Sequence, residues 1–361
     1  MRILVATDAW HPQISGVVRT LEALASAVRT LGSTIDFLTP DGFATAPPPT
    51  YPGLRCALPS PAEIAWRIQL ARPDAIHVAT EGPIGFMVRR HCLRQALPFT
   101  TSFTTRFPEY IAARVPLPVS WGYAALRRFH AAAVATMVST PTLAVELTER
   151  GFARLKMWSR GVDNQLFRPQ RTLQPAWPRP IFMSVGRIAS EKNLEAFLSL
   201  PLPGTKVVIG EGPQAADLRA RFPQAQFLGS MGGEQLAAHM AAADVFVFPS
   251  RTDTFGIVQL EALSCGVPVA AYPVTGPLDV IGKSPAGVLD DDLQQACLRA
   301  LDVPRAACRA HALRFSWEAS AAQFLSHLSH IAADVFKPVG ALQVDWEEKT
   351  LGSLKSGVRW S

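Results

Sequence analysis

Short apolar runs alternate with longer segments of helical periodicity along most of the chain. The runs at 2–8, 34–40, 74–80 and 98–104 have the length of ordinary strands and are rich in apolar and branched residues. Between the first two runs, segment 16–32 carries apolar positions three and four residues apart, which predicts an amphipathic helix. Strands that alternate with helices predict parallel sheets that are covered on both faces.

A proline-rich stretch at 168–180 interrupts this alternation, which restarts after it. The length of 361 residues agrees with two domains. We therefore predict an α/β protein with two doubly wound Rossmann-like domains, at 1–167 and 181–318, that face a cleft. Segment 319–361 predicts a C-terminal helix and a polar tail that pack back on the N-terminal domain. The strands expected in the second domain are 181–186, 206–212, 225–229, 244–250 and 267–273.

The composition excludes several classes of protein. The most apolar long stretch, 131–145, is too short and too rich in Thr, Ser and Pro to span a membrane. The first ten residues lack the layout of a secretion signal and predict a strand instead. Five scattered cysteines without a CxxC pair indicate reduced thiols in a cytoplasmic protein, with neither a zinc site nor a disulfide framework.

The net charge of +6 lies entirely in the first half of the chain. Residues 1–165 hold 17 Lys and Arg against 11 Asp and Glu, whereas the rest is balanced. Such an excess favours an anionic membrane surface, a polyanion or acidic substrates, although an ordinary solvated surface is the alternative. Segment 62–73 alternates Arg67 and Arg72 with apolar residues and could lie on an anionic bilayer or face the core. Nucleic acid is not expected as a partner, because no aromatic and basic platform accompanies the charge.

Two carboxylates, Asp253 and Glu261, bracket a glycine, Gly256, that begins a helix directly after the strand at 244–250. Glycine lets the backbone come close to a ligand, and the free N–H groups of a helix start form an anion site that suits a diphosphate. Glu261 could then accept hydrogen bonds from ribose hydroxyls, and Asp253 could contact a sugar beyond the phosphates. The alternatives are that Asp253 is a helix N-cap and that Glu261 is a solvated helix residue.

Two cations and a second glycine support the ligand-binding interpretation. Arg187 and Lys192 follow the strand at 181–186 and could face a diphosphate leaving group, unless they form an exposed surface pair. Gly16 stands at a strand-to-helix turn near the N-terminus, where its backbone could approach the phosphates from the other domain. The three residues predict a diphosphate between the two domains.

With these pieces in place, the chain resembles a family-4 retaining glycosyltransferase of the GT-B fold, from residue 1 to about 330. It is most similar to the bacterial glycolipid subgroups, of the diacylglycerol or sulfoquinovosyl type. The segments that carry the resemblance are "SGVV", "SVGRIASEKN", "GEGP" and "FPSRTDTFGIVQLEALSCGVPVAAYPVTGP". The last is close to the family's E-x7-E signature.

The resemblance implies roles for individual residues. Catalysis would fall to Arg187 and Lys192, which stabilise the leaving diphosphate, and to Asp253, which contacts the donor sugar. The reaction would retain the anomeric configuration and need neither a metal nor another cofactor. Donor binding would fall to Gly16, Phe255, Gly256, Ile257, Val258 and Glu261.

Two departures from the family pattern bear on the chemistry. Asp253 stands where the family usually has Glu, and Thr104 stands where it commonly has His. A general base is not required, because in front-face transfer the leaving phosphate can accept the proton. His11, His77 and His130 are candidates for the vacant role, although ordinary structural roles are favoured for all three.

The acceptor substrate is expected to bind to the basic N-terminal half. The residues predicted for this site are Glu81, Gly82, Thr104, Arg106 and Glu109, although Arg106 and Glu109 could equally form a salt bridge. The stretch "LDDDL" at 289–293 contains the D-x-D metal motif of a different glycosyltransferase fold, but it precedes a helical segment and is better explained as a helix cap.

These observations predict an enzyme that moves a hexose or hexuronate from a nucleotide-sugar, preferably UDP-linked, to a membrane lipid such as diacylglycerol. The protein would lie on the inner face of the plasma membrane. One alternative is a polysaccharide or other soluble acceptor. The other, motivated by Asp253 and Thr104, is a non-catalytic protein that binds a sugar nucleotide. The base, the sugar and the oligomeric state are left open by the sequence.

Overall fold

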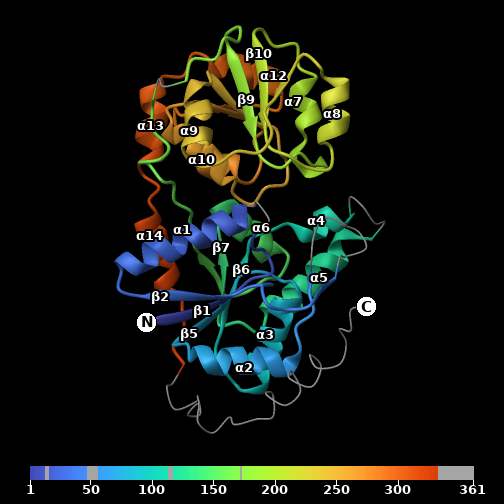
Figure 1. Cartoon of the computed structure of the whole chain (residues 1–361), viewed down its shortest axis with the longest axis vertical. Coiled ribbons are helices and arrows are strands. Elements are labelled where there is room, and N and C mark those ends of the chain that lie inside the picture. The colour runs from blue at the N-terminus through green and yellow to red at the C-terminus, as the bar shows by residue number, and fades with distance from the viewer. Residues whose placement is uncertain (13–15, 47–55, 113–116, 171–172, 332–361) are drawn as a thin grey trace, which may run out of the picture.

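The computed structural model describes residues 1–12, 16–46, 56–112, 117–170 and 173–331. Two lobes are stacked along the longest axis of the molecule, with the N-terminal lobe at the bottom of Figure 1 and the C-terminal lobe at the top. Each lobe is built around a six-stranded sheet in which all neighbouring strands are parallel. The prediction of two doubly wound Rossmann-like domains is therefore confirmed.

The N-terminal sheet has the strand order β2-β1-β5-β6-β7-β8. Alternate residues of β1 face opposite sides, so that Leu4 and Ala6 enter one apolar cluster while Ile3 and Val5 enter another. Both faces of the sheet are thus covered by helices. The strands are β1 (Arg2–Ala6), β2 (Thr34–Leu38), β5 (Ala75–Val78), β6 (Thr100–Phe103), β7 (Ala135–Val138) and β8 (Leu155–Met157). The helices are α1 (Gly16–Thr30), α2 (Pro61–Ala71), α3 (Pro83–Arg94), α4 (Phe107–Ala112), α5 (Val119–His130) and α6 (Pro141–Glu149), and β3 (Thr45–Ala46) pairs with β4 (Cys56–Ala57) beside them.

The C-terminal sheet repeats this plan with the order β11-β10-β9-β12-β13-β14. Its central strands are almost fully apolar, as expected for a sheet buried on both faces. The strands are β9 (Ile181–Val185), β10 (Thr205–Ile209), β11 (Gln226–Phe227), β12 (Val245–Phe248), β13 (Val269–Ala271) and β14 (Gly287–Leu289). The helices are α7 (Leu194–Leu198), α8 (Ala215–Arg221), α9 (Gly233–Ala242), α10 (Ile257–Ser264), α11 (Pro277–Val280), α12 (Leu293–Ala300) and α13 (Arg305–Ala312), with a 3₁₀ turn η1 (Ser190–Lys192).

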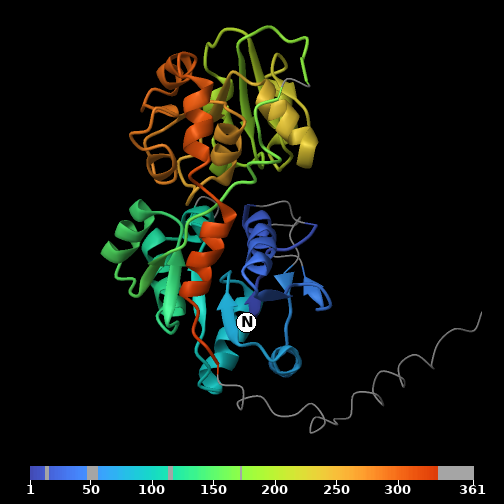
Figure 2. The ribbon, with the colours of Figure 1, turned by 90° about the vertical axis from the view of Figure 1, so that its left-hand side faces the viewer.

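The chain crosses between the lobes twice. The first crossing occurs before the expected linker, because Val162 and Phe167 are already buried in the core of the C-terminal lobe. At the second crossing, helix α14 (Trp317–Ser326) leaves the C-terminal lobe and lies beside α1 on the N-terminal lobe (Figures 1 and 2). There Phe324 is fully buried, and Trp158 Nε1 donates a hydrogen bond of 3.1 Å to Ser320. The polar tail expected after this helix lies outside the described residues from 332 onward.

Two smaller predictions can be compared with the structure. Asp292 in "LDDDL" caps α12, with its carboxylate accepting from the backbone N–H groups of Gln294 and Gln295 at 2.9 and 3.2 Å, so the helix-cap interpretation is confirmed. The apolar stretch at 131–145 contains β7 and the start of α6. Among the described residues, no helix has the length and apolar character needed to cross a membrane.

Candidate active site

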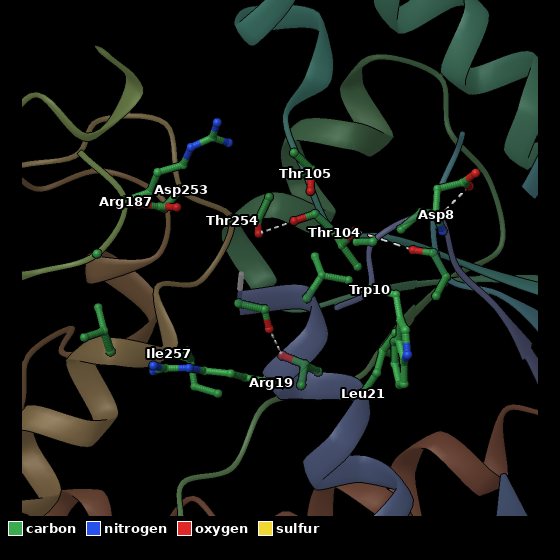
Figure 3. A pocket seen from close by; sticks show the side chains of 18 of the residues that line it. Asp8, Trp10, Arg19, Leu21, Thr104, Thr105, Arg187, Asp253, Thr254 and Ile257 are labelled. Carbon is green, nitrogen blue, oxygen red and sulfur yellow. Dashed lines mark hydrogen bonds between the residues drawn. The ribbon is translucent and has the colours of Figure 1, made fainter. Parts of the chain in front are cut away.

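A cleft of about 1170 Å³ separates the lobes, and residues of both lobes line it. In Figure 3, Arg187, Asp253 and Ile257 lie on the C-terminal side, whereas Trp10, Arg19 and Thr104 lie on the N-terminal side. Most of these residues stand in loops at the carboxyl ends of strands or in the helix turns that follow. This is the part of a parallel α/β sheet where ligands bind.

The start of α10 forms the C-terminal wall of the cleft. Gly256 precedes the helix with φ 77° and ψ 66°, a left-handed conformation that favours glycine. A Cβ at this position would lie 2.6 Å from both Phe248 Cζ and Gln259 Nε2. Ile257 and Val258, the first two helical residues, line the cleft. Their backbone N–H groups have no partner within the helix, so this end of α10 is suited to bind an anion.

Lys192 and Asp253 form an ion pair on this wall of the cleft. Lys192 Nζ lies 2.7 Å from each carboxylate oxygen of Asp253, and the carboxylate is mostly buried. The loop that carries Lys192 is held in place because Asn193 Nδ2 donates to the main-chain oxygen of Pro249 at 3.1 Å. Asp253 does not cap α10, because Gly256 occupies the N-cap position. Arg187 lines the same wall, so the two predicted cations and the carboxylate gather at one place.

Glu261 is buried in the second turn of α10, which overturns the alternative of a solvated helix residue. Its carboxylate faces Arg19 Nη1 of helix α1 at 3.3 Å, so this ion pair joins the two lobes. Figure 3 shows Arg19 extending from α1 toward Ile257. Burial raises the pKa of Glu261, and the neighbouring guanidinium of Arg19 partly opposes that shift. A buried carboxylate with one partner is well placed to accept hydrogen bonds from the hydroxyls of a ligand.

The loop before α10 is also tied to the N-terminal lobe. Thr254 Oγ1 donates to the main-chain oxygen of Thr104 at 2.8 Å (Figure 3). Ser139 Oγ donates to the main-chain oxygen of Thr254 at 3.0 Å. In addition, the backbone N–H of Thr142 donates to Asp279 at 3.0 Å. Thr104 therefore lies at the cleft, and its main chain helps to position the loop that carries Asp253.

Gly16 opens helix α1 and lines the cleft from the N-terminal side, as the sequence predicts. Nothing lies within 4 Å of the position that a Cβ would take on it. Phe255 also lines the cleft and is nearly buried. Five of the six residues predicted to bind the donor therefore line the cleft, whereas Glu261 is buried one turn further along α10 and is not among the described lining residues. Their contacts with a donor stay a prediction.

Four of the predicted acceptor residues are not among the described residues that line the cleft, which include only Thr104 of that set. Arg106 is buried between Glu146, at 2.5 Å, and Glu109, at 3.4 Å, so the salt-bridge alternative describes its contacts. Glu81 accepts a hydrogen bond of 3.1 Å from His130 in the core. Their role in binding the acceptor stays a prediction.

Gly82 has a clear structural function. A Cβ on this residue would lie 2.4 Å from the carboxyl carbon of Asp8. The carboxylate of Asp8 fills that space and accepts hydrogen bonds from Thr80 Oγ1 at 2.9 Å and from the backbone N–H of Ile84 at 2.8 Å, which caps α3. Burial raises the pKa of Asp8. Asp8 lines the cleft, so Gly82 contributes to the cleft through its neighbour.

The three histidines have the structural roles that the sequence favours. His77 is fully buried between Thr100 Oγ1, at 2.9 Å, and Ser102 Oγ, at 3.2 Å, and burial lowers its pKa to about 3. His130 is buried beside Glu81. His11 lines the cleft but is mostly exposed and lies 2.6 Å from Glu22.

Within the described part of the chain, no group of three or more His, Cys, Asp or Glu residues is arranged to hold a metal ion. Whether the reaction is independent of metals stays a prediction from the resemblance.

Three cleft residues, Asp8, Arg19 and Arg160, are absent from the sequence prediction. Arg19 lies three residues after Gly16 on the same helix, and that spacing places both on one face. Asp8 lies two residues after the end of β1, where the carboxyl-end rule points to ligand contacts. Arg160 follows β8, a strand of three residues that gives too weak a pattern to recognise in the sequence.

Comparisons with known proteins agree with this architecture. A family model described as Glycosyltransferase Family 4 matches residues 14–166, and one described as Glycosyl transferases group 1 matches residues 179–302. The sulfoquinovosyl transferase SQD2 of Arabidopsis thaliana is 32% identical over 68% of this chain, and the match spans about half of that relative, 52% of its length.

A further relative and a solved structure match over nearly the whole chain. The GDP-mannose-dependent alpha-(1-6)-phosphatidylinositol dimannoside mannosyltransferase of Mycobacterium tuberculosis is 25% identical over 92% of this chain and 97% of its own length. The solved structure of sucrose-phosphate synthase from Thermosynechococcus elongatus superposes with a TM-score of 0.72 at 19% identity, covering 90% of this chain and 97% of that one. That likeness shows a shared fold. The two matched domains and the cleft between them establish that the chain belongs to the family 4, or group 1, glycosyltransferases of the GT-B fold and uses a nucleotide-sugar.

Proposed function

We propose that this chain is a retaining, metal-independent glycosyltransferase that moves a hexose or hexuronate to a membrane lipid such as diacylglycerol. The observation that carries the proposal is the meeting of Lys192, Asp253 and Arg187 beside the free N-terminus of α10, with Glu261 one turn further. This arrangement offers cations for a diphosphate, a carboxylate for a sugar and a second carboxylate for a ribose.

The chemistry follows from these positions. The diphosphate of the donor binds the first N–H groups of α10, and Glu261 accepts hydrogen bonds from the ribose. As the bond between the anomeric carbon and the diphosphate oxygen breaks, negative charge grows on that oxygen, and Lys192 and Arg187 stabilise it. A hydroxyl of the acceptor attacks the anomeric carbon from the same face. Its proton passes to the departing phosphate oxygen, so the products are an α-glycoside and a nucleoside diphosphate.

Histidine chemistry is not needed in this scheme. Thr104 stands where the resemblance expects a histidine, and His77 and His130 are buried in hydrogen-bond networks of the N-terminal core. Among the described residues that line the cleft, His11 is the only histidine, and it is paired with Glu22. These contacts support the leaving phosphate as the proton acceptor.

A lipid acceptor is supported by an exposed surface of the N-terminal lobe, which we call the α3–α5 surface. It consists of outward-facing residues of two adjacent helices, neither of which contains Asp or Glu. The helices are in contact, because Arg89 Nε on α3 donates to the main-chain oxygen of Phe129 on α5 at 2.8 Å. The surface comprises Phe86, Arg90, Leu93, Arg94, Trp121 and Arg128.

The α3–α5 surface combines exposed rings and aliphatic chains with arginines, which suits an anionic bilayer. Nearby, Phe107 and Ile111 of α4 are exposed and also line the cleft, so apolar groups continue from the helices toward the active site. A lipid anchored in a bilayer could present its headgroup to the cleft along this path.

Helix α2, which the sequence singles out for membrane binding, is less suited to it. Its Ile64 and Ile68 are buried in the core, while Trp66 is exposed. Arg67 stacks on Phe43 and donates to two main-chain carbonyls and to Glu63, so its charge is satisfied within the lobe. We therefore propose that the α3–α5 surface, and not α2, contacts the membrane.

The donor base is proposed to be uracil, with guanine as the competing possibility. The name of the mycobacterial relative specifies GDP-mannose, whereas that of the plant relative specifies a sulfoquinovosyl group. The phosphatidylinositol-linked acceptor in the mycobacterial name also agrees with a lipid acceptor. A polysaccharide or other soluble acceptor is the main alternative.

A transfer assay tests the proposal. Purified protein is incubated with radiolabelled UDP- and GDP-sugars and with diacylglycerol in anionic vesicles, and products are separated by thin-layer chromatography. A labelled glycolipid is expected, with a rate that falls about 10²- to 10³-fold in Lys192→Ala and is unchanged in Lys283→Ala, an exposed lysine outside the cleft lining. Donor hydrolysis without a lipid product would move the acceptor to a soluble glycan. Nucleotide binding with neither product would favour a non-catalytic protein.

A further inference from the structure

Arg160 is a buried cation at the cleft. It follows β8 on the N-terminal side and lines the cleft, with 6% of its surface exposed. Its Nη1 donates to the main-chain oxygen of Trp158 at 2.6 Å, and its guanidinium lies 4.0 Å from the centre of the Trp158 ring. The side chain is thus held in one orientation at the edge of an open space.

Arg160 has no acidic partner among the described residues. Arg106, the other buried arginine among the described residues, differs because Glu146 and Glu109 neutralise its charge. Burial alone lowers the pKa of Arg160, to about 9, which leaves the guanidinium charged at neutral pH. Removing a cation from water is costly unless an anion or several hydrogen bonds compensate it. A buried cation that lines a substrate cleft and has no acidic partner is typical of a site that binds an anion.

The diphosphate of the donor already has other partners in the proposed function. Arg187, Lys192 and the start of α10 all belong to the C-terminal lobe. Arg160 comes from the N-terminal side, near the core residue His77, whose pKa its charge helps to lower. Its hydrogen bonds to the main-chain oxygens of Trp158 and Ser159 both use Nη1, so, as far as the described residues go, Nε and Nη2 remain to bind an oxyanion.

We propose that Arg160 binds an anionic group of a substrate, a carboxylate, sulfonate or phosphate, and so makes the enzyme selective for a charged donor sugar or a charged acceptor headgroup. The proposal rests on the proposed function for the nucleotide-sugar and adds a second, separate anion subsite. It also gives a reason for a buried arginine without a carboxylate partner.

Isothermal titration calorimetry with matched ligand pairs distinguishes the two sources of the anion. The donor pairs are UDP-glucuronate with UDP-glucose, and GDP-mannuronate with GDP-mannose. The acceptor pair is glycerol 3-phosphate with glycerol, titrated with and without UDP or GDP. We expect the charged member of one pair to bind at least about tenfold more tightly than its neutral partner. A donor pair that discriminates places the anion on the sugar, and the acceptor pair places it on the headgroup.

Substitutions of Arg160 test whether this residue causes the discrimination, that is, the difference in affinity between the charged and the neutral ligand of a pair. Arg160→Gln should abolish it, and Arg160→Lys should retain part of it. Arg305→Gln is the matched control, because Arg305 also donates to two main-chain carbonyls, at 2.7 and 2.8 Å, but does not line the cleft. Circular dichroism establishes that each variant is folded.

Two outcomes would overturn the proposal. One is that no pair discriminates in the unmodified protein, a result that does not depend on the folding of any variant. The other is that Arg160→Gln is folded and discriminates as well as the unmodified protein. Both differ from failure of the proposed function, which would appear as absence of glycosyl transfer even if an anionic ligand binds through Arg160.

Discussion

At the scale of single residues, the cleft holds charges in positions that cost stability. Glu261 is the clearest case, because burial raises its pKa while Arg19 is its only charged partner among the described contacts. A carboxyl whose pKa is raised on folding destabilises the folded state once the pH exceeds its unfolded pKa. The function proposed for Glu261, to bind ribose, explains why such a residue is kept.

Glu261→Gln should therefore change stability and binding in opposite directions. The free energy of unfolding should rise at pH 7 to 8, because the buried charge is removed. This gain should shrink as the pH falls and vanish below the unfolded pKa near 4.5, where the carboxyl of the original protein is protonated in both states. The affinity for UDP or GDP should fall by roughly ten- to a hundredfold, the value of hydrogen bonds to a charged group. Thermal unfolding across this pH range and calorimetry measure the two effects, and a variant that loses stability at pH 7 would contradict the first.

The same residues show what a sequence can predict about a site. Asp253, Lys192 and Glu261 could be found because local spacing places each beside a strand end or a helix start. Arg19 shares a helix face with Gly16, but its pairing with Glu261, 242 residues away, could not be predicted. The lack of an acidic partner for Arg160 among the described residues could not be predicted either. Arg106 and Glu109 were predicted near the acceptor, but pairing with Glu146 on another helix satisfies the arginine.

At the scale of elements, the turn before α10 combines a left-handed backbone conformation, which favours glycine, with a functional position. Gly256→Ala should destabilise the protein by about 1 kcal/mol or more, because alanine is unfavourable at φ 77° and its Cβ would meet Phe248 and Gln259 at 2.6 Å. Gly16→Ala is the matched comparison, since it begins a helix with nothing within 4 Å of the new Cβ. It should leave the unfolding temperature nearly unchanged while weakening nucleotide binding. Thermal melts with and without UDP or GDP test both variants, and equal loss of stability in the two would contradict the argument.

The longer elements were predictable, whereas some of the shortest were not. The helix at 16–32 and the strands near 2–8 and 181–186 match α1, β1 and β9 closely, since their apolar patterns extend over several residues. Strands β8 and β14, of three residues each, were not expected, whereas β13 and β11, of three and two residues, lie in the apolar runs predicted at 267–273 and 225–229. The boundary between the lobes also came earlier than expected, because Phe167 packs on the C-terminal core although it precedes the proline-rich stretch.

At the scale of the whole molecule, the described lobes are joined by the chain near Val162, by the chain that enters α14, and by a few contacts across the cleft. Arg19→Ala removes the ion pair with Glu261, which competes with ribose for the same carboxylate. Glu261 is buried and Arg19 is about one-third exposed, so loss of the pair leaves a buried carboxylate free for the ribose, and the affinity for UDP or GDP should rise. Small-angle X-ray scattering without nucleotide should show a larger radius of gyration. Arg29→Ala, an exposed arginine on the same helix, is the control, and weaker nucleotide binding in Arg19→Ala alone would show that Arg19 binds the donor directly.

The distribution of charge between the lobes leads to a prediction about membranes. Replacing Arg90, Arg94 and Arg128 with glutamine on the α3–α5 surface should weaken binding to vesicles that contain phosphatidylglycerol. Each basic residue near an anionic surface contributes about 1 kcal/mol, so the loss should be tenfold or more and should diminish at high salt.

The matched control replaces three arginines of the C-terminal lobe, Arg219, Arg221 and Arg299, all at least partly exposed, and changes the net charge equally. Vesicle flotation measures both triple variants against the unmodified protein. If only the triple variant of the α3–α5 surface loses binding, the membrane contact lies on the N-terminal lobe. Helix α4 of this lobe leads into the cleft, where a lipid headgroup can reach the donor. If both variants lose binding equally, the attraction depends on net charge and the α3–α5 surface has no special role.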